Sequence, residues 1–121
     1  MMNFKKSLLG FVLLPIASIV AFSGVASAET IRTKHFQINI TRNCSEGNIS
    51  CDDVTYVGQD LRTGKSIRLT GKTVNRARSY TFLGYEFRNG PYTYSVTRNN
   101  VLLIYKDEQL ILREQGVSIG D

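Results

Sequence analysis

Apolar and polar residues alternate along most of the chain after residue 34, which is the pattern of half-buried β-strands. Phe36, Ile38 and Ile40, for example, fall on one strand face, with polar residues between them. No helical apolar period lasts beyond a few residues, so we predict short strands and no helix. The predicted strands cover residues 34–41, 53–59, 66–74, 79–88, 92–98, 101–105 and 109–113.

Turn-forming residues separate these segments. The turns are expected at Asp60–Lys65, Asn89-Gly90, Asn99-Asn100 and Lys106–Glu108. Short connections between sequential strands favour an antiparallel meander, and closure of a small meander removes its unpaired edges. We therefore predict an all-β fold, a small antiparallel meander closed or nearly closed into a barrel of about seven strands, followed by a frayed tail at 115–121.

Two glycines inside the predicted strands indicate irregular backbone. Gly71 lies in the middle of its segment, which suggests a bulge or bend there. The segment 79–88 is apolar on both faces around Gly84, so this strand is expected to be central in the sheet or to change face at that glycine.

The N-terminus has the three parts of a secretory signal peptide. Lys5 and Lys6 precede an apolar run over residues 8–22, and Ala26-Ser27-Ala28 matches a small-residue cleavage site. The alternative is a retained membrane anchor, but the run is shorter than the roughly 20 residues of a spanning helix. We expect a signal peptide at 1–28, a single domain at 29–121 and a bacterial periplasmic or secreted protein without a stable membrane anchor.

Once the predicted signal peptide is set aside, the size and net charge of the remaining chain limit its possible functions. The whole chain has 121 residues and a formal charge of +5. Removal of residues 1–28 takes away two lysines and no acidic residue, leaving 93 residues at +3. This is one small domain, and its modest charge provides little electrostatic attraction for nucleic acid, so no nucleic acid partner is expected.

The only two cysteines, Cys44 and Cys51, both lie in the predicted mature domain. An even cysteine count in a small exported domain indicates a disulfide. The spacing fits neither a redox C-x-x-C motif nor a zinc knuckle, and the single His35 cannot complete a four-ligand metal site. We predict a structural bridge across an eight-residue loop and no metal.

Several short motifs resemble known catalytic or ligand-binding motifs, but their sequence context does not support those functions. Thr63-Gly64-Lys65-Ser66 resembles the end of a P-loop, but a strand follows where a P-loop needs a helix. Asp52 and Asp53 are neighbours in an extended segment and point to opposite sides. No serine or cysteine is paired with a base, although a Ser–Lys arrangement stays open. We predict no catalytic residue, no cofactor and a protein that is not an enzyme.

The meander topology brings alternate connections to the same end of the barrel. The loops at 42–52, 75–78 and 98–100 then share one rim, which collects four arginines. Arginine offers a fixed fork of donors to carboxylate or phosphate, so this rim is the candidate site for an acidic partner; the alternative is scattered solvated charges. Its arginines are Arg42, Arg76, Arg78 and Arg98.

The hairpin region around residues 84–98 resembles a family of small exported β-barrels that inhibit C-type lysozyme. These proteins carry a glycine-tyrosine stretch and then a tyrosine-containing strand that ends in Thr-Lys-Gly. The chain has Gly84-Tyr85 and later Tyr92-Thr-Tyr-Ser-Val-Thr-Arg98, and the match covers about twenty residues. It lacks Ser-Gly-x-x-Tyr, and Thr97-Arg98-Asn99 replaces Thr-Lys-Gly. The resemblance implies an inhibitory loop around Tyr94, Thr97 and Arg98.

A second similarity is to exported bacterial OB-fold proteins, through the strands 66–74, 80–82 and 92–96. Both resemblances imply binding modules. The leading hypothesis is therefore an exported binding protein whose partner is another protein, such as a lysozyme, another cell-wall hydrolase or a toxin. The alternative is an OB-like module that binds a small ligand or glycan with tyrosines at the barrel mouth, because tyrosine combines an apolar ring with a polar tip.

Overall fold

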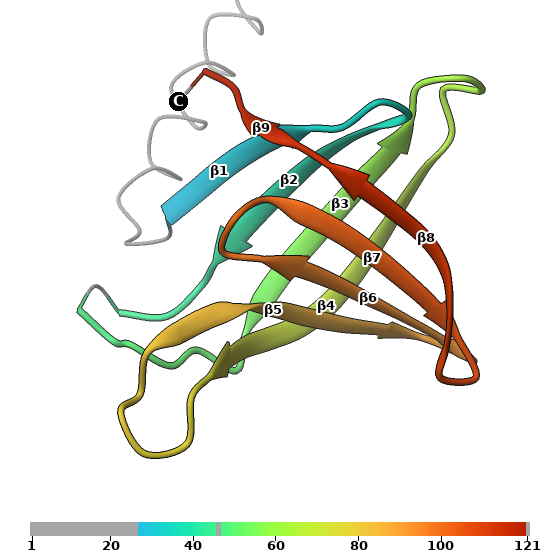
Figure 1. Cartoon of the computed structure of the whole chain (residues 1–121). Coiled ribbons are helices and arrows are strands. Elements are labelled where there is room, and N and C mark those ends of the chain that lie inside the picture. The colour runs from blue at the N-terminus through green and yellow to red at the C-terminus, as the bar shows by residue number, and fades with distance from the viewer. Residues whose placement is uncertain (1–26, 46, 121) are drawn as a thin grey trace, which may run out of the picture.

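The computed structural model describes residues 27–45 and 47–120 (Figure 1). This part of the chain contains nine β-strands and no helix, as the alternating pattern predicts. The strands are β1 (Ser27–Arg32), β2 (Phe36–Arg42), β3 (Val54–Asp60), β4 (Ser66–Asn75), β5 (Phe82–Asn89), β6 (Tyr92–Thr97), β7 (Val101–Lys106), β8 (Gln109–Gln115) and β9 (Val117–Ser118).

The strands form one antiparallel meander that nearly closes into a barrel. The order in the sheet is β8-β7-β6-β5-β4-β3-β2-β1-β9, so every strand from β1 to β8 pairs with its sequence neighbour. β8 and β9 lie on either side of Gly116; β8 pairs with β7, and β9 pairs with β1. The last segment therefore connects both edges of the meander. This sequential order is not the Greek-key order of an OB-fold, so that similarity does not extend to the topology.

Two strands were not expected from the sequence. β1 has a single buried large apolar residue, Ile31, and so lacks a visible alternation. The tail expected to fray contains β9, where Val117 pairs with Arg32 and the Ile119 amide donates to the Thr30 carbonyl at 2.9 Å. The prediction of about seven strands is corrected to nine, because backbone pairing orders segments whose side chains are largely exposed.

The barrel interior is filled by the apolar face of each strand. Ile38 and Ile40 from β2, Tyr56 from β3, Phe87 from β5 and Leu102 from β7 are all nearly inaccessible to solvent. They belong to a single cluster that extends through the barrel. Burial of these side chains is the main favourable contribution to folding, at about 1.5–3 kcal/mol for each large apolar residue.

The two strand glycines have different roles. Gly71 stays in register between Val54 and Phe87, and no bulge lies there. A Cβ atom at this position would lie 2.0 Å from the Glu86 carbonyl oxygen, so close backbone approach requires glycine. At Gly84 the backbone φ is 148° and the register with β4 shifts. The strand is central and does change face there, which allows Phe82 to contact Tyr85 on the inner side at 5.1 Å between ring centroids.

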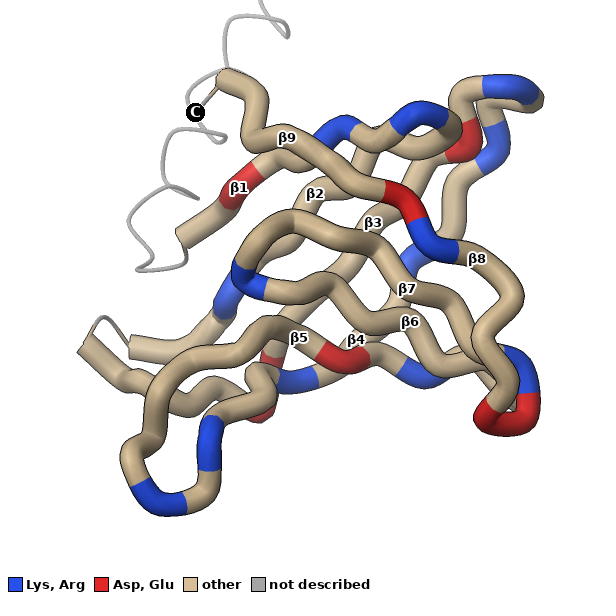
Figure 2. The backbone as a smooth tube through the Cα atoms, in the orientation of Figure 1, with Lys and Arg blue, Asp and Glu red and all other residues tan. Residues whose placement is uncertain are grey.

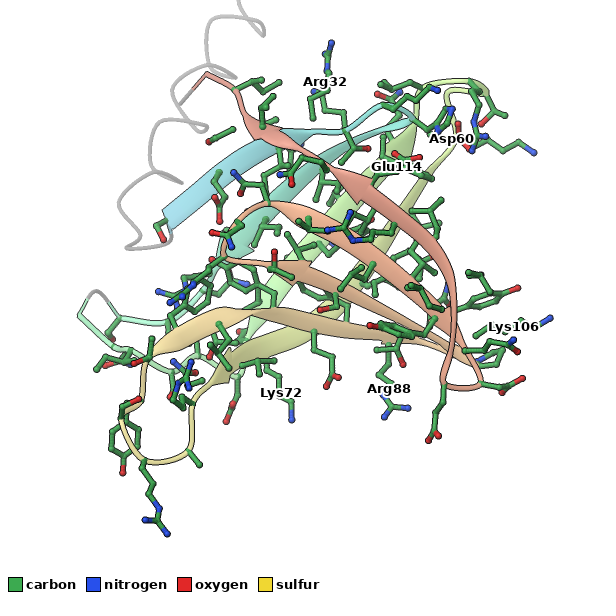
Figure 3. The ribbon with its side chains drawn as sticks, viewed as in Figure 1. Arg32, Asp60, Lys72, Arg88, Lys106 and Glu114 are labelled. Carbon is green, nitrogen blue, oxygen red and sulfur yellow. A yellow bond between two sulfur atoms is a disulfide. The ribbon has the colours of Figure 1, made fainter. Side chains whose placement is uncertain are left out.

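A hydrogen-bonded cluster of Thr33, His35 and Glu114, which we call the polar seam, joins the turn between β1 and β2 to β8. The Glu114 carboxylate accepts hydrogen bonds from the Thr33 hydroxyl at 2.7 Å and from the His35 backbone N–H at 3.1 Å. Its second oxygen lies 2.5 Å from Nδ1 of His35. Burial acts to raise the pKa of Glu114, but the bonds from His35 and Thr33 outweigh it and hold the pKa below its usual value. Figure 3 labels Glu114 on this strand.

The predicted disulfide is confirmed. Cys44 and Cys51 are bonded, with their Cα atoms 5.8 Å apart, and they close the loop between β2 and β3. The loop is also attached to β4, because the Cys51 amide donates to the Thr73 hydroxyl and the Thr73 amide donates to the Cys51 carbonyl, both at 2.9 Å. The bridge is therefore part of the core packing at this end of the barrel.

The predicted signal peptide falls on residues 1–26 and on the first two residues of β1, so most of it lies outside the described residues. Cleavage at the expected site after Ala28 would make Glu29, which pairs with Ile40, the first residue of β1. Within residues 27–45 and 47–120, no helix has the length and apolar character needed to cross a membrane.

Loss of the disulfide is expected to destabilise the barrel. The Cys44→Ser and Cys51→Ser double variant should lose about 2.5 kcal/mol of unfolding free energy, because an eight-residue loop is no longer closed in the unfolded chain. Urea unfolding of the variant, beside the unaltered protein with and without reductant, measures this difference. Equal stability of the oxidised and reduced forms would contradict the prediction.

Glu114→Gln should destabilise the folded protein by about 2 kcal/mol at neutral pH, because charge-assisted bonds are replaced by weaker ones. The pKa of Glu114 is lower in the folded chain, so its contribution is complete above the unfolded value of about 4.3 and disappears as the pH falls. Unfolding curves measured from neutral to acidic pH should converge for the two proteins. A constant difference at all pH values would refute the assignment.

Candidate functional site

The barrel has two chemically different ends. The connections after β2, β4 and β6, residues 43–53, 76–81 and 98–100, lie together, and we call this the disulfide end (Figure 1). The tight turns at 33–35, 61–65, 90–91 and 107–108 lie at the opposite end, which we call the turn end. This arrangement agrees with the prediction that alternate connections share a rim.

The turn end contains a cavity of about 320 Å³, which we call the turn-end cavity. This volume is near the lower limit for small-molecule sites. Its walls are mostly apolar and come from five strands, while polar side chains lie toward the turn between β3 and β4. The lining residues are Phe36, Tyr56, Gly58, Asp60, Thr63, Lys65, Ile67, Tyr94 and Ile104.

The shape of this cavity depends on Tyr56 and Gly58. The Tyr56 ring packs 5.0 Å from the Phe87 ring and 5.5 Å from the Tyr94 ring, centroid to centroid. Its hydroxyl end lies over Gly58, where an added Cβ would be 2.6 Å from the phenolic oxygen. Burial raises the pKa of Tyr56 well above its ordinary value, and the neighbouring Tyr94 adds to the shift. Tyr56 is thus a neutral hydrogen-bonding group at neutral pH.

Polar groups at the edge of the turn-end cavity are ordered by the β3–β4 turn. The side chain of Arg62 donates from Nε to Oδ1 of Asp60 at 3.1 Å, and its guanidinium lies 5.8 Å from the centre of the Phe36 ring. These bonds from Arg62 hold the pKa of Asp60 below its usual value. The edge therefore presents a neutralised Asp60–Arg62 pair beside Lys65.

The disulfide end separates the four predicted arginines into two kinds. Arg76, Arg78 and Arg98 are exposed on the loops, where Figure 2 shows basic positions. Arg42 is half-buried instead, and its guanidinium carbon lies 5.2 Å from the Phe82 ring centre and 5.8 Å from the Tyr85 ring centre. Arg42 is therefore part of the inner wall of the barrel rather than a freely solvated rim residue.

The three residues implied by the lysozyme-inhibitor resemblance are not brought together. Tyr94 points into the barrel and packs on Tyr56, at the turn end. Thr97 and Arg98 lie at the disulfide end, and the Thr97 hydroxyl accepts the amides of Asn99 and Val101 at 3.3 and 3.1 Å. Tyr94 therefore belongs to the turn-end cavity, while Thr97 serves the β6–β7 turn.

The described residues show no cluster of three or more histidine, cysteine or acidic side chains that could hold a metal ion. His35, the one histidine of the chain, is engaged with Glu114 in the seam. Asp52 and Asp53 are both exposed, and Asn43 Nδ2 donates to Asp53 Oδ1 at 3.2 Å. The segment Thr63–Ser66 forms a hairpin turn into β4, as predicted.

Comparison of the chain with protein-family models, with curated proteins and with solved structures gives no match in any of the three. The interpretation of the site therefore depends on its own geometry.

Sequence reasoning missed the inner environment of Arg42 and the roles of Tyr56 and Gly58. The sequence did contain a signal for the inward position of Arg42, because Arg42 follows Ile38 and Ile40 at the spacing of two that marks one strand face. Gly58 likewise follows Tyr56 on the inner face of β3. The position of the Tyr56 ring over Gly58 could not be predicted in this way, because it depends on Phe87 and Tyr94, which approach from other strands.

Proposed function

We propose that this chain is an exported binding protein and that its ligand site is the turn-end cavity. The observation that carries the proposal is a cavity of about 320 Å³ at the mouth of a barrel whose interior is otherwise occupied by packed side chains. Eight-stranded barrels are about the size at which an interior is either filled or holds one small ligand.

The lining indicates the ligand class. Phe36, Ile67 and Ile104 provide apolar walls, and the two tyrosines contribute aromatic surface. Thr63 and Lys65 lie at the open edge beside Asp60, whose carboxylate is paired with Arg62. A small molecule with an apolar ring or chain inside the cavity, and a polar or anionic group beside Lys65, satisfies both parts of the lining. A free sugar matches it less well, because the mostly apolar lining offers few partners for the many hydroxyl groups of a sugar.

A second candidate is a protein partner at the disulfide end, such as the cell-wall hydrolase or toxin expected from the sequence. The exposure of Arg76, Arg78 and Arg98 on adjacent loops favours this candidate. The two functions use opposite ends of the barrel and can be tested separately.

Fluorescence titration with anilinonaphthalene sulfonate, which combines aromatic rings with one anionic group, tests the proposal. The exported, oxidised protein should bind the probe saturably. Gly58→Ala should weaken binding by about tenfold or more, because the added methyl group displaces the Tyr56 ring into the cavity. Ile67→Phe should weaken it as well by filling the cavity from its edge, since Ile67 lines the cavity and is 37% exposed.

Gln59→Ala is the matched control, because Gln59 neighbours Gly58 on β3 but is exposed on the outer face. Thermal unfolding identifies any variant that fails to fold. If both cavity variants fold and bind the probe as tightly as the Gln59→Ala control, the turn-end cavity is not the site.

A further inference from the structure

The loop between β4 and β5, residues 76–81, presents an exposed tyrosine in a strained backbone conformation. Tyr80 is the most exposed of the large apolar and aromatic side chains that the structure describes, at 62%. Its φ is 59°, in the left-handed region that residues with bulky side chains rarely adopt. The other non-glycine residues of the described chain with a positive φ are polar and lie at tight turns: Asn100, Asp107 and Glu108. A tyrosine here carries both backbone strain and an exposed ring, and such strain is typical of functional positions.

Hydrogen bonds within the loop hold Tyr80 in this conformation. The Arg76 amide donates to the Thr81 carbonyl at 2.8 Å, and the Tyr80 amide donates to the Arg76 carbonyl at 2.9 Å. The Asn75 side chain donates to the Tyr80 carbonyl at 3.3 Å. The loop extends beyond the ends of β4 and β5 (Figure 1). It therefore holds the tyrosine at a fixed place on the disulfide end.

A second exposed apolar side chain lies on the neighbouring loop. Ile49, in the loop closed by the disulfide, is 55% exposed. Its carbonyl accepts a hydrogen bond at 3.4 Å from the same Asn75 nitrogen that donates to the Tyr80 carbonyl. The two loops are therefore side by side, and we call Ile49 and Tyr80 the apolar pair.

Basic side chains flank the apolar pair. Arg76 and Arg78 lie in the same loop as Tyr80, and this loop contains no acidic residue (Figure 2). Arg98 lies in the turn between β6 and β7, at the same end. All three arginines are exposed, and within residues 27–45 and 47–120 none of them forms an ion pair. The acidic residues in the connections of this end all belong to the disulfide-closed loop: Glu46, Asp52 and Asp53. The surroundings of Tyr80 are therefore locally basic.

A lipid surface fits this arrangement better than a protein surface. Stable protein interfaces take about 800 Å² and 20–30 residues from each partner, whereas the exposed apolar side chains here are confined to two loops. Peripheral binding to a membrane needs less, because apolar side chains enter the headgroup region while basic residues are attracted to anionic lipids. Tyrosine suits that region, since its ring is apolar and its hydroxyl is polar.

We infer that the disulfide end binds reversibly to membrane surfaces that contain anionic phospholipids. Tyr80 and Ile49 enter the headgroup region, and the three exposed arginines donate to phosphate oxygens. The strain at Tyr80 is retained because it fixes the ring where the membrane contact needs it. The turn-end cavity then faces away from the lipid, so the inference does not depend on the ligand proposed for that cavity.

A tryptophan placed at the loop reports this contact, because the chain has no other tryptophan. Tyr80→Trp in the exported, oxidised protein should show a saturable blue shift of its emission with vesicles of phosphatidylglycerol and phosphatidylcholine in equal amounts. Lipids with brominated chains should quench it. Leu61→Trp is the matched control, because Leu61 is also exposed but lies at the turn end. No shift at Tyr80→Trp, an equal shift at both positions, or equal binding to phosphatidylcholine alone would overturn the inference.

Removal of the ring separates membrane contact from stability. Asparagine tolerates a positive φ, so Tyr80→Asn should fold with an unchanged or higher melting temperature. The same variant should co-sediment with the mixed vesicles about fivefold more weakly or less, because it lacks the apolar ring. Leu61→Asn is the control and should bind as the unaltered protein does. Equal vesicle affinity of the two asparagine variants would refute the role of Tyr80.

Two triple variants separate the position of the arginines from net charge. Replacing Arg76, Arg78 and Arg98 by glutamine should remove the preference for phosphatidylglycerol, since each arginine near the surface contributes about fivefold. The control replaces the same number of exposed arginines on the strands: Arg68, Arg88 and Arg113. It should retain most of the binding. Equal losses in the two folded variants would show attraction by net charge alone and overturn the assignment of the disulfide end.

Discussion

The structure depends on how its last segment closes the sheet. The Glu114 carboxylate connects β8 to the turn between β1 and β2, and directly after Gly116 the chain pairs with β1 through Val117 and Ser118. A Cβ atom at Gly116 would lie 2.7 Å from the Ile31 side chain, so this crossing point needs glycine. Without the pairing of β9, the end of β1 would also be an open edge, and open edges invite pairing with other chains.

Closure also explains why the two ends of the barrel differ. Meander topology sends successive connections to opposite ends, and here the two longest connections, 43–53 and 76–81, both lie at the disulfide end. At the turn end, short turns leave the mouth lined by strand residues, which are apolar inside. At the disulfide end, the bridged loop covers the interior and holds a charged residue beneath it. Basic and acidic side chains elsewhere, such as Lys72 and Arg88, point away from the barrel (Figure 3). The chemistry available for binding is therefore concentrated in two places.

Much of this fold could be predicted from the alternation of side chains, and the rest could not for identifiable reasons. The inner faces of β2, β3 and β6 follow a period of two, so Ile38, Tyr56 and Val96 are buried as expected. β1 and β9 were missed because backbone hydrogen bonds order them, and Val117 is 59% exposed. At the disulfide end, the bridge and the grouping of loops were predictable from spacing and topology. The orientation of Arg42 required the β5 bulge, whose effect on Phe82 depends on register with β4.

The central claim is that the C-terminal segment closes the barrel and makes β1, β8 and β9 part of one cooperative structure. Amide hydrogen exchange tests this most directly, because the Gly116 amide donates to the Asn100 carbonyl and the Ile119 amide to the Thr30 carbonyl. We expect both amides to exchange with protection comparable to that of β3 amides such as Tyr56. Rapid exchange at Gly116 and Ile119, with strong protection confined to β2 through β7, would show an open sheet and contradict the account.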